Sequence, residues 1–328
     1  MSIGILGSGA FGTALAIALA KAGREVILWS RDAEFVRELT VTRKNARHLP
    51  GAELTMNIRP TADISKLKSC EAILLAVPAQ STSSLLTICA ASLPLVPLVI
   101  CAKGIEKVSQ RLQSEIVSDL APNHQIAALT GPGFAQEIAA GLPTALTLAC
   151  EDSQSGQSLQ ALLSTPRLRL YLTNDIRGAQ LAGSLKNVVA LACGMVAGAA
   201  LGESARAALM TRGFAEMSRL AMAMGAKPET LSGLSGLGDL ALTCNSAQSR
   251  NFANGFALGQ GKVTAAGTTV EGIATAFAAC ELARKFAVEM PIANAVAAVI
   301  EGKISISSAM DMLLTRPLRT ETIAGDPQ

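Results

Sequence analysis

Residues 2–29 of the chain, SIGILGSGAFGTALAIALAKAGREVILW, decide the fold of its N-terminal half. Ser2–Leu6 is an apolar run typical of a buried parallel strand, and Glu25–Trp29 is a second such run. Between them, Thr13–Ala22 consists of strong helix formers, and Gly23 suits the left-handed residue that ends a helix. Strand, glycine-rich turn, helix and strand in this order predict a βαβ unit.

The turn of this unit has the pattern GxGxxG, formed by Gly7, Gly9 and Gly12. A lone GxGxxG also occurs in ordinary flexible turns, so the flanking strands and helix carry the interpretation. In that setting the first glycine permits the tight turn, the second lets a pyrophosphate approach, and the third lets the helix pack on the strand. We therefore expect a dinucleotide whose phosphates lie on the amides at the helix N-terminus.

The second strand ends in Trp29-Ser30-Arg31-Asp32. A hydroxyl and a guanidinium stand where NAD-specific proteins place a carboxylate, which favours NADP over NAD. In the alternative interpretation, Arg31 stacks on the adenine or faces solvent, and Asp32 serves NAD.

The composition is that of a close-packed protein with two domains. The 328 residues are 50% hydrophobic, 16% charged and 3% aromatic, which favours close backbone approach in parallel sheets and helices. Seven cysteines without a CxxC pair, and only two histidines, indicate neither a disulfide framework nor a metal site. We expect buried thiols in a reducing cytoplasm.

Charge and hydropathy exclude two classes of partner. A net charge of +3, with one Trp and one Tyr, leaves no basic surface with stacking residues, so we expect no nucleic acid partner. The apolar N-terminus lacks the basic region of a signal peptide. The uncharged stretch 72–102 is broken by Pro78, Pro94 and Pro97, so we expect no membrane span and a cytoplasmic location.

Further strand-like runs predict an α/β fold, a doubly wound Rossmann domain over residues 1–178. These runs are Ala72–Val77, Leu98–Cys101, Ile126–Leu129, Thr144–Ala149 and Leu168–Leu172. Residues 179–318 read as an all-α domain, within which 178–224 is one long apolar-periodic region and Thr268–Glu271 opens the last helical section as a capping box. Residues 319–328 are expected to be a tail.

Candidate site stretches lie at or just beyond the ends of three predicted strands, and the first of them is Val77-Pro78, after the apolar run AILLA. Lys103 comes after Leu98–Cys101, and Gly131-Pro-Gly133-Phe-Ala135 comes after Ile126–Leu129. Ligands of open α/β sheets bind outside the carboxyl ends of the strands, which places Lys103 in the expected crevice. The alternative is an ordinary surface lysine at a strand exit.

In the helical half, Lys186 lies in an otherwise apolar helix. Such a lysine is costly unless it reaches a charge, a ligand or solvent, and partial desolvation lowers the pKa of a lysine so that it can exchange a proton near neutrality. This favours Lys186 as a proton donor. In the alternative interpretation, the helix is amphipathic and Lys186 lies on its solvent-exposed face. Downstream, the glycine-rich turn 233–240 delivers Asp239, and Ser249-Arg250-Asn251 form a set suited to an anion.

Together these motifs resemble one family, the bacterial-type NAD(P)-dependent glycerol-3-phosphate dehydrogenases. The matching stretches, in the family's order, are GSGAFGTALA (7–16), VICAKGIE (99–106), TGPGFAQEIAAGLPTA (130–145), SLKNVVALACGMVAG (184–198), ARAALMTRG (205–213), GLSGLGDLALTC (233–244), SRN (249–251) and TVEG (269–272).

The resemblance implies reversible reduction of dihydroxyacetone phosphate to sn-glycerol 3-phosphate for phospholipid synthesis, by a homodimer. It implies that Lys186 is the general acid and base. Substrate contacts are implied for Lys103, Gly131, Gly133, Lys186, Asp239, Ser249, Arg250 and Asn251. Cofactor contacts are implied for Gly7, Gly9, Ala10, Phe11, Gly12, Arg31, Lys103, Ala135, Arg250, Thr269 and Glu271.

The sequence departs from the family pattern at two positions. Phe252 stands where the family usually has an arginine, and Gly133 stands where many members have Ser or Thr. Both departures bear on substrate affinity. Two other functions fit parts of the pattern: a 3-hydroxyacid dehydrogenase acting on a carboxylate, and a non-catalytic dinucleotide sensor that would have lost Lys186 or Asp239.

Overall fold

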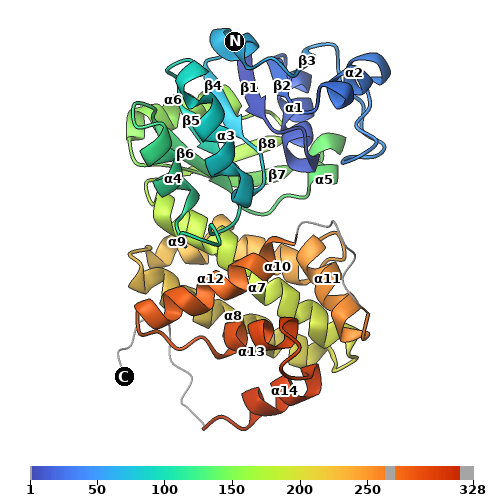
Figure 1. Cartoon of the computed structure of the whole chain (residues 1–328), viewed down its shortest axis with the longest axis vertical. Coiled ribbons are helices and arrows are strands. Elements are labelled where there is room, and N and C mark those ends of the chain that lie inside the picture. The colour runs from blue at the N-terminus through green and yellow to red at the C-terminus, as the bar shows by residue number, and fades with distance from the viewer. Residues whose placement is uncertain (1, 263–269, 318–328) are drawn as a thin grey trace. The chain divides into compact units, whose positions relative to one another are not determined.

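A computed structural model describes residues 2–262 and 270–317 of the chain (Figure 1). It divides into two compact units, described separately below. The first comprises Met1–Lys103 and Gln113–Ile176, and the second comprises Gly104–Leu112 and Arg177–Gln328. The segment 104–112 lies within the predicted domain 1–178, but its Ile105 and Leu112 are buried in the hydrophobic core of the second unit.

The first unit is built on an eight-stranded sheet with the order β3-β2-β1-β4-β5-β6-β7-β8 (Figure 1). All neighbours are parallel except β6 and β7. Since β2 and β4 flank β1 on opposite sides, the strand order reverses there, as in a doubly wound Rossmann fold. The predicted fold class is confirmed. The strands are β1 (Ser2–Leu6), β2 (Glu25–Trp29), β3 (Ile58–Thr61), β4 (Ala72–Leu75), β5 (Leu98–Ile100), β6 (Ile126–Thr130), β7 (Thr144–Cys150) and β8 (Leu168–Thr173).

Helices alternate with these strands, and α1 packs on the sheet through small and branched side chains. Ala14, Leu15 and Ile17 of α1 share one buried cluster with Ile3 and Ile5 of β1. The helices are α1 (Ala10–Lys21), α2 (Ala33–Thr42), α3 (Thr82–Cys89), α4 (Gln113–Leu120), α5 (Ala135–Ala140) and α6 (Ser153–Leu163), with short 3₁₀ turns at η1 (Ile64–Ser69), η2 (Ala79–Ser81) and η3 (Ala90–Ser92).

Two elements of this unit differ from the sequence prediction. Helix α1 begins at Ala10 instead of Thr13, because Gly9 is the N-cap and the last half of the glycine motif already forms the first helical turn. Strand β3 was not predicted, since its sequence IRPT is short and contains Pro60. A proline has no N–H to donate, and β3 tolerates it because it pairs on one side only, at the edge of the sheet.

The second unit contains no strand among its described residues and consists of helices. They are α7 (Ile176–Gly198), α8 (Glu203–Ala223), α9 (Pro228–Ser232), the π-helical turn η4 (Leu234–Gly238), α10 (Asp239–Cys244), α11 (Arg250–Gly259), α12 (Glu271–Lys285), α13 (Pro291–Ile300) and α14 (Ile306–Leu314) (Figure 1). The region 178–224 is two helices, separated where Ala200 and Gly202 adopt positive φ angles of 56° and 96°. The predicted capping box at Thr268–Glu271 lies partly outside the described residues.

Helices α7 and α11 approach each other backbone to backbone. A Cβ on Gly255 would lie 2.0 Å from the carbonyl oxygen of Leu191, and one on Gly198 would lie 2.1 Å from that of Phe256. A Cβ on Gly194 would lie 2.1 Å from the carbonyl oxygen of Phe252, and one on Gly259 would lie 2.4 Å from that of Met195. The glycine-rich composition therefore serves close helix packing, as the sequence predicted.

Helix α7 has the length and hydropathy of a membrane-spanning helix, but 89% of its apolar window is buried inside the structure. A helix that forms the core of a folded protein meets the same criteria of length and composition. Burial of α7 among the other helices accounts for its apolar sequence.

All seven cysteines are free thiols, and six of them are buried. Burial raises the pKa of Cys101 to about 12 and that of Cys89 to about 11, so these thiols stay protonated. They behave as the small buried side chains that the sequence predicted.

One buried carboxylate joins two helices of the second unit. Glu216 of α8 is 4% exposed, and its oxygens accept hydrogen bonds from the backbone amides of Ile292 and Ala293 at 2.7 and 3.4 Å. Helix α13 has no cap from its own N-cap residue, Met290, so Glu216 takes the place of a cap. Burial raises the pKa of Glu216 to about 7.

This raised pKa predicts a specific dependence of stability on pH. A carboxyl group with a folded pKa near 7 and an ordinary unfolded value stabilises the fold fully below the unfolded pKa, and loses this contribution as pH rises through 7. Glu216→Gln cannot ionise. Relative to the variant, the unmodified protein should therefore lose about 3 kcal/mol of unfolding free energy between pH about 5 and about 8.

Urea unfolding at several pH values measures this difference. Glu229→Gln, an exposed glutamate on α9, is the matched control and should follow the unmodified protein at each pH. A constant difference between Glu216→Gln and the unmodified protein over this range would contradict the prediction.

Candidate functional site

The glycine-rich turn of the first unit has two packed glycines and one open glycine. Gly7 has φ 120°, and a Cβ there would lie 2.7 Å from the backbone of Ala76. A Cβ on Gly12 would lie 2.1 Å from the carbonyl oxygen of Gly7. No described atom lies within 4 Å of a Cβ placed on Gly9, and the N-terminus of α1 has no side-chain cap. The turn therefore fits a pyrophosphate that approaches Gly9 and accepts from the first amides of α1.

Three predicted site residues lie together beside this turn. The Lys103 Nζ donates a hydrogen bond to the carbonyl oxygen of Gly131 at 2.8 Å, and it lies 5.9 Å from the centre of the Phe11 ring. Phe11 and Ala10 form the first turn of α1, and Lys103 follows β5 by three residues. The structure thus brings a cation to the carboxyl end of the sheet, where the sequence predicted it.

Gly131 and Gly133 lie on the loop between β6 and α5, and Ala135 is the first residue of α5. Gly131 has φ 123°, which favours glycine. A Cβ on Gly133 would meet three side chains at 3.1 to 3.3 Å, the nearest being Ile138. A serine or threonine at this position would need those side chains to shift by a few tenths of an ångström, so the glycine suits this packing.

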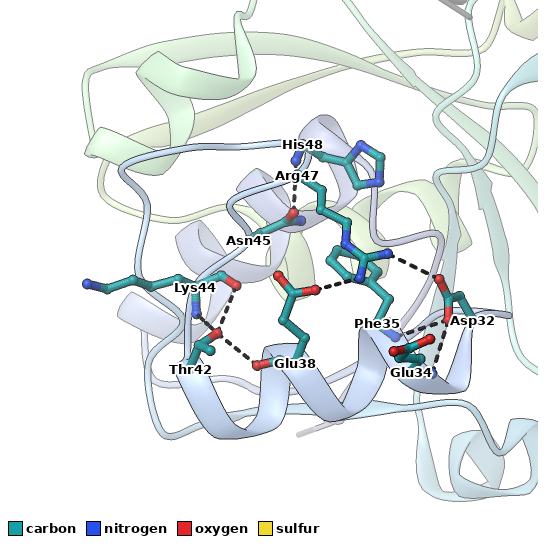
Figure 2. Close-up of polar contacts among 9 residues, drawn as sticks. All are labelled: Asp32, Glu34, Phe35, Glu38, Thr42, Lys44, Asn45, Arg47 and His48. Atoms are coloured by element: carbon teal, nitrogen blue, oxygen red, sulfur yellow. Dashed lines mark hydrogen bonds and ion pairs between the residues drawn. The ribbon is translucent and has the colours of Figure 1, made fainter.

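At the end of β2, the two candidate residues for cofactor selection have different environments. Arg31 is exposed, while Asp32 is the N-cap of α2 and accepts hydrogen bonds from the amides of Glu34 and Phe35, both at 3.0 Å (Figure 2). The exposure of Arg31 is compatible with both interpretations, and Asp32 is engaged as the cap of α2.

Sequence reasoning missed a buried amide that holds the glycine-rich turn. Asn45 is 0% exposed and donates to the Ser8 carbonyl oxygen at 2.9 Å and to the Thr13 hydroxyl at 2.7 Å. Its own Oδ1 accepts from the amide of His48 at 3.0 Å. Asn45 therefore ties the loop after α2 to the turn at Gly7–Gly12. No local pattern marks this asparagine, because its partners are distant in sequence.

In the second unit, Lys186 is buried and paired. It is 6% exposed, and its Nζ donates to Oδ1 of Asp239 at 2.8 Å and to the hydroxyl of Thr243 at 2.5 Å. The Thr243 hydroxyl in turn donates to the Asp239 carbonyl oxygen at 2.6 Å. The structure brings two predicted residues together and adds Thr243, whose spacing of four residues from Asp239 places both on one face of α10.

The glycines before Asp239 explain how a carboxylate reaches this buried position. Residues 234–238 form the π-helical turn η4, and α10 starts at Asp239. A Cβ on Gly236 would lie 1.8 Å from the carbonyl oxygen of Leu231, so only glycine fits. Such π-turns are frequent at functional sites.

The predicted anion-binding set, Ser249-Arg250-Asn251, opens α11. Ser249 is its N-cap, with the hydroxyl accepting from the Phe252 amide at 3.2 Å. Asn251 donates to Oδ1 of Asn187 at 2.9 Å and accepts from the amide of Gly272 at 2.9 Å. Two members of the set thus make contacts within the helical unit, while Arg250 is exposed at the first helical position.

Two predicted residues, Glu271 and Thr269, and one departure from the family pattern, Phe252, remain. Glu271 is the first residue of α12, next to the Gly272 amide that Asn251 binds. Thr269 lies outside the described residues. Phe252, one of the two departures from the family pattern, is 7% exposed and contributes to the core of the helical unit.

The fold and the open glycine turn define a Rossmann protein with a helical second half. Two family models cover most of the chain: NAD-dependent glycerol-3-phosphate dehydrogenase N-terminus, over residues 2–156, and C-terminus, over residues 175–311. The chain belongs to this family.

Individual relatives agree with this assignment. The chain is 52% identical to glycerol-3-phosphate dehydrogenase (NAD(P)+) of Ruegeria sp. strain TM1040, over 98% of this chain and 100% of the relative. It is 51% identical to the protein of the same name from Paracoccus denitrificans, with the same coverage. A crystal structure of glycerol-3-phosphate dehydrogenase from Coxiella burnetii has 38% identity and a TM-score of 0.91, over 96% of this chain and 99% of that one.

The buried ion pair predicts a large loss of stability when one partner is removed. Asp239→Asn leaves the Lys186 ammonium buried opposite a neutral amide, which should cost about 3–5 kcal/mol of unfolding free energy. Urea unfolding followed by circular dichroism measures this loss. The double variant Lys186→Met/Asp239→Leu carries no buried charge and should lose less than the single variant. The prediction fails if the double variant is the less stable of the two.

Proposed function

We propose that the chain reversibly reduces dihydroxyacetone phosphate to sn-glycerol 3-phosphate with NADPH or NADH, NADPH being favoured, and so supplies glycerophospholipid synthesis. The observation that carries this proposal is the buried Lys186, held by Asp239 and Thr243 in a chain that belongs to the glycerol-3-phosphate dehydrogenase family. We infer the identity of the substrate from the family, and the transfer of the proton from the buried lysine.

Lys186 is the general acid and base of this proposal. The Asp239 carboxylate at 2.8 Å favours the ammonium form of Lys186, and burial strengthens its field. Reduction of the ketone builds negative charge on the C2 oxygen, which an ammonium within hydrogen-bond reach stabilises and then protonates. In the oxidative direction the neutral amine removes the hydroxyl proton. The bound dinucleotide supplies or accepts the hydride.

Asp239 and Thr243 position the amine of Lys186. The Thr243 hydroxyl donates to the backbone of Asp239 and so presents its oxygen lone pairs to the lysine. With the amine fixed by two partners on one face of α10, little rotational freedom remains for Lys186 to lose when substrate binds. Asp239 is also proposed as a substrate contact.

Arg250 binds the substrate phosphate in this proposal. It stands at the first position of α11, where the helix dipole and the guanidinium both favour an anion. Ser249 and Asn251 fix the start of this helix through the cap and through the bonds to Asn187 and Gly272. Binding energy gained on the remote phosphate orients the carbonyl. Lys103, Gly131 and Gly133 of the first unit are the other proposed substrate contacts.

The nucleotide is assigned to the first unit. Gly7, Gly9 and Gly12 shape the turn, and the residues proposed around the rest of the cofactor are Ala10, Phe11, Arg31, Lys103, Ala135, Arg250, Thr269 and Glu271. The open approach at Gly9 and the uncapped α1 support the pyrophosphate position. A homodimer and a cytoplasmic location complete the proposal.

The direct test follows the absorbance of NADPH, and separately of NADH, with dihydroxyacetone phosphate as substrate. We expect the nucleotide to be oxidised only when dihydroxyacetone phosphate is present, and NADPH to be oxidised faster than NADH. Activity only on a 3-oxo acid would favour the hydroxyacid dehydrogenase alternative, and binding without turnover would favour the sensor.

Replacement of the proton donor tests the assignment of Lys186. Lys186→Met should lower kcat by about 10³-fold, because both charge stabilisation and proton transfer are lost. NADPH binding, measured by quenching of protein fluorescence, should stay near that of the unmodified protein. Turnover close to normal in this variant would rule out the proposed role.

Replacement of Arg250 tests the phosphate assignment. Arg250→Ala should raise the KM for dihydroxyacetone phosphate by about 10- to 100-fold, the loss expected for a charge-assisted contact. Arg284→Ala removes an exposed arginine of α12, paired with Glu281, and serves as the control. Equal KM values for Arg250→Ala and the control would count against the assignment.

A further inference from the structure

A second arginine lies beside the end of β2, on the loop after α2. The Arg47 guanidinium forms ion pairs with Asp32 at 3.3 Å and with Glu38 at 2.7 Å, and it lies 4.6 Å from the centre of the Phe35 ring (Figure 2). We call Asp32, Phe35, Glu38 and Arg47 the Arg47 cluster. Nothing in the sequence pattern connects Arg47 with the cofactor, since it lies 15 residues after Asp32.

Both carboxylate oxygens of Asp32 are engaged within this cluster. Oδ1 accepts from the amides of Glu34 and Phe35, and Oδ2 accepts from Arg47 (Figure 2). The amide of Phe35 is the largest influence that holds the pKa of Asp32 below its usual range, so the group is ionised at neutral pH. Asp32 is therefore oriented by α2 and by Arg47, in contrast to the acidic residue that binds the ribose hydroxyls in NAD-specific Rossmann proteins.

The position of Arg47 is fixed from the other side by the turn that binds the nucleotide. Asn45, two residues earlier, is fully buried against Ser8 and Thr13, and its Oδ1 accepts from the amide of His48. The loop cannot move away from β2 without breaking these bonds. Arg47 thus stays next to the strand end where the adenosine ribose of a dinucleotide binds in this fold.

The charged side chains at the end of β2 affect the choice between NADP and NAD. Arg31 is exposed, and among the described residues it has no hydrogen bond or ion pair. Directly after it, Asp32 carries a negative charge that would repel a 2′-phosphate. Arg47 offsets this charge, and without Arg47 the carboxylates of Asp32 and Glu38 would both lose this cationic partner.

We propose that Arg47 is a specificity-determining residue: by pairing with Asp32 it removes the acidic character of the β2 end and so allows Arg31 to bind the 2′-phosphate of NADP. The proposal rests on the proposed dinucleotide function. Arg47 acts through Asp32 and is a positioning residue in this scheme. Its effect is confined to the 2′-phosphate, because NAD carries no charge at that position.

The test measures dissociation constants of NADPH and NADH by fluorescence titration of the substrate-free protein at low ionic strength. Arg47→Met keeps an unbranched apolar side chain and removes the charge. It should weaken NADPH binding about fivefold and change NADH binding less than about twofold, and the effect should shrink as salt screens it. Arg47→Lys keeps a charge and should retain most of the selectivity.

Restoring the charge balance is the decisive step. Asp32→Asn preserves an N-cap side chain, so Arg47→Met/Asp32→Asn should regain the NADPH affinity that Arg47→Met loses. Asp32→Asn alone should bind NADPH at least as tightly as the unmodified protein and leave NADH binding unchanged. If Asp32 instead holds the ribose of NAD, this single variant weakens NADH binding, and the proposal is overturned.

Lys44 provides a matched control, since it lies on the same loop and its side chain points away from Asp32, where it pairs with Glu53 (Figure 2). Lys44→Ala removes the same charge and should leave the NADPH to NADH ratio unchanged. Exposed ion pairs contribute little to stability, so the melting temperature of Arg47→Met should stay close to normal.

Each remaining outcome decides one proposal. Equal weakening of both nucleotides by Arg47→Met, or failure of Asp32→Asn to rescue, overturns the role of Arg47 and leaves the dehydrogenase function standing. Absence of binding to either nucleotide in the unmodified protein overturns the dinucleotide function itself.

Discussion

A charged amine inside an apolar helix must have a partner, and this requirement organises the second unit. Lys186 is buried on α7, and its partner Asp239 has to reach it from the start of α10. The π-helical turn that delivers Asp239 requires a glycine at position 236. Thr243 then follows one helical turn later, on the same face as the carboxylate. The requirement that Lys186 has a buried partner thus explains residues 234–243, whose glycine-rich start resembles an ordinary loop in the sequence.

The first unit depends on the absence of side chains at two glycines of the turn between β1 and α1. Gly7 and Gly12 allow strand, turn and helix to pack without a side chain between them, while Gly9 stays open to a ligand. A buried asparagine, Asn45, fastens the following loop to this turn. The same loop carries Arg47 to the end of β2. The turn proposed to bind the phosphates and the arginine proposed to select the nucleotide are therefore held together by the hydrogen bonds of Asn45.

Much of this architecture could be predicted from the sequence, because its signals are local. Buried strands such as β1 and β2 appear as short apolar runs, and the glycine motif marks the turn between β1 and α1. Lys186 stood out because a charge in an apolar helix is expensive. Strand β3 escaped prediction because an edge strand needs few apolar residues and tolerates a proline.

The contacts that sequence reasoning missed join residues far apart in the chain. Asn251 binds Asn187 and Gly272, and Glu216 caps α13, which begins at Pro291. No spacing rule connects such pairs, since only the packed helices bring them together. Thr243 is different: its spacing from Asp239 is a local signal, and it could have been found once Asp239 was chosen.

The backbone contact between α7 and α11 has a consequence for which molecules the site can accept. Helix α7 carries the amine, and α11 begins with the arginine assigned to the phosphate. With carbonyl oxygens set directly against glycines, the two helices have no soft side-chain layer through which to slide or tilt. If Lys186 and Arg250 hold the ketone and the phosphate as proposed, this rigid helix pair fixes the distance between the two groups and disfavours phosphorylated ketones of another chain length.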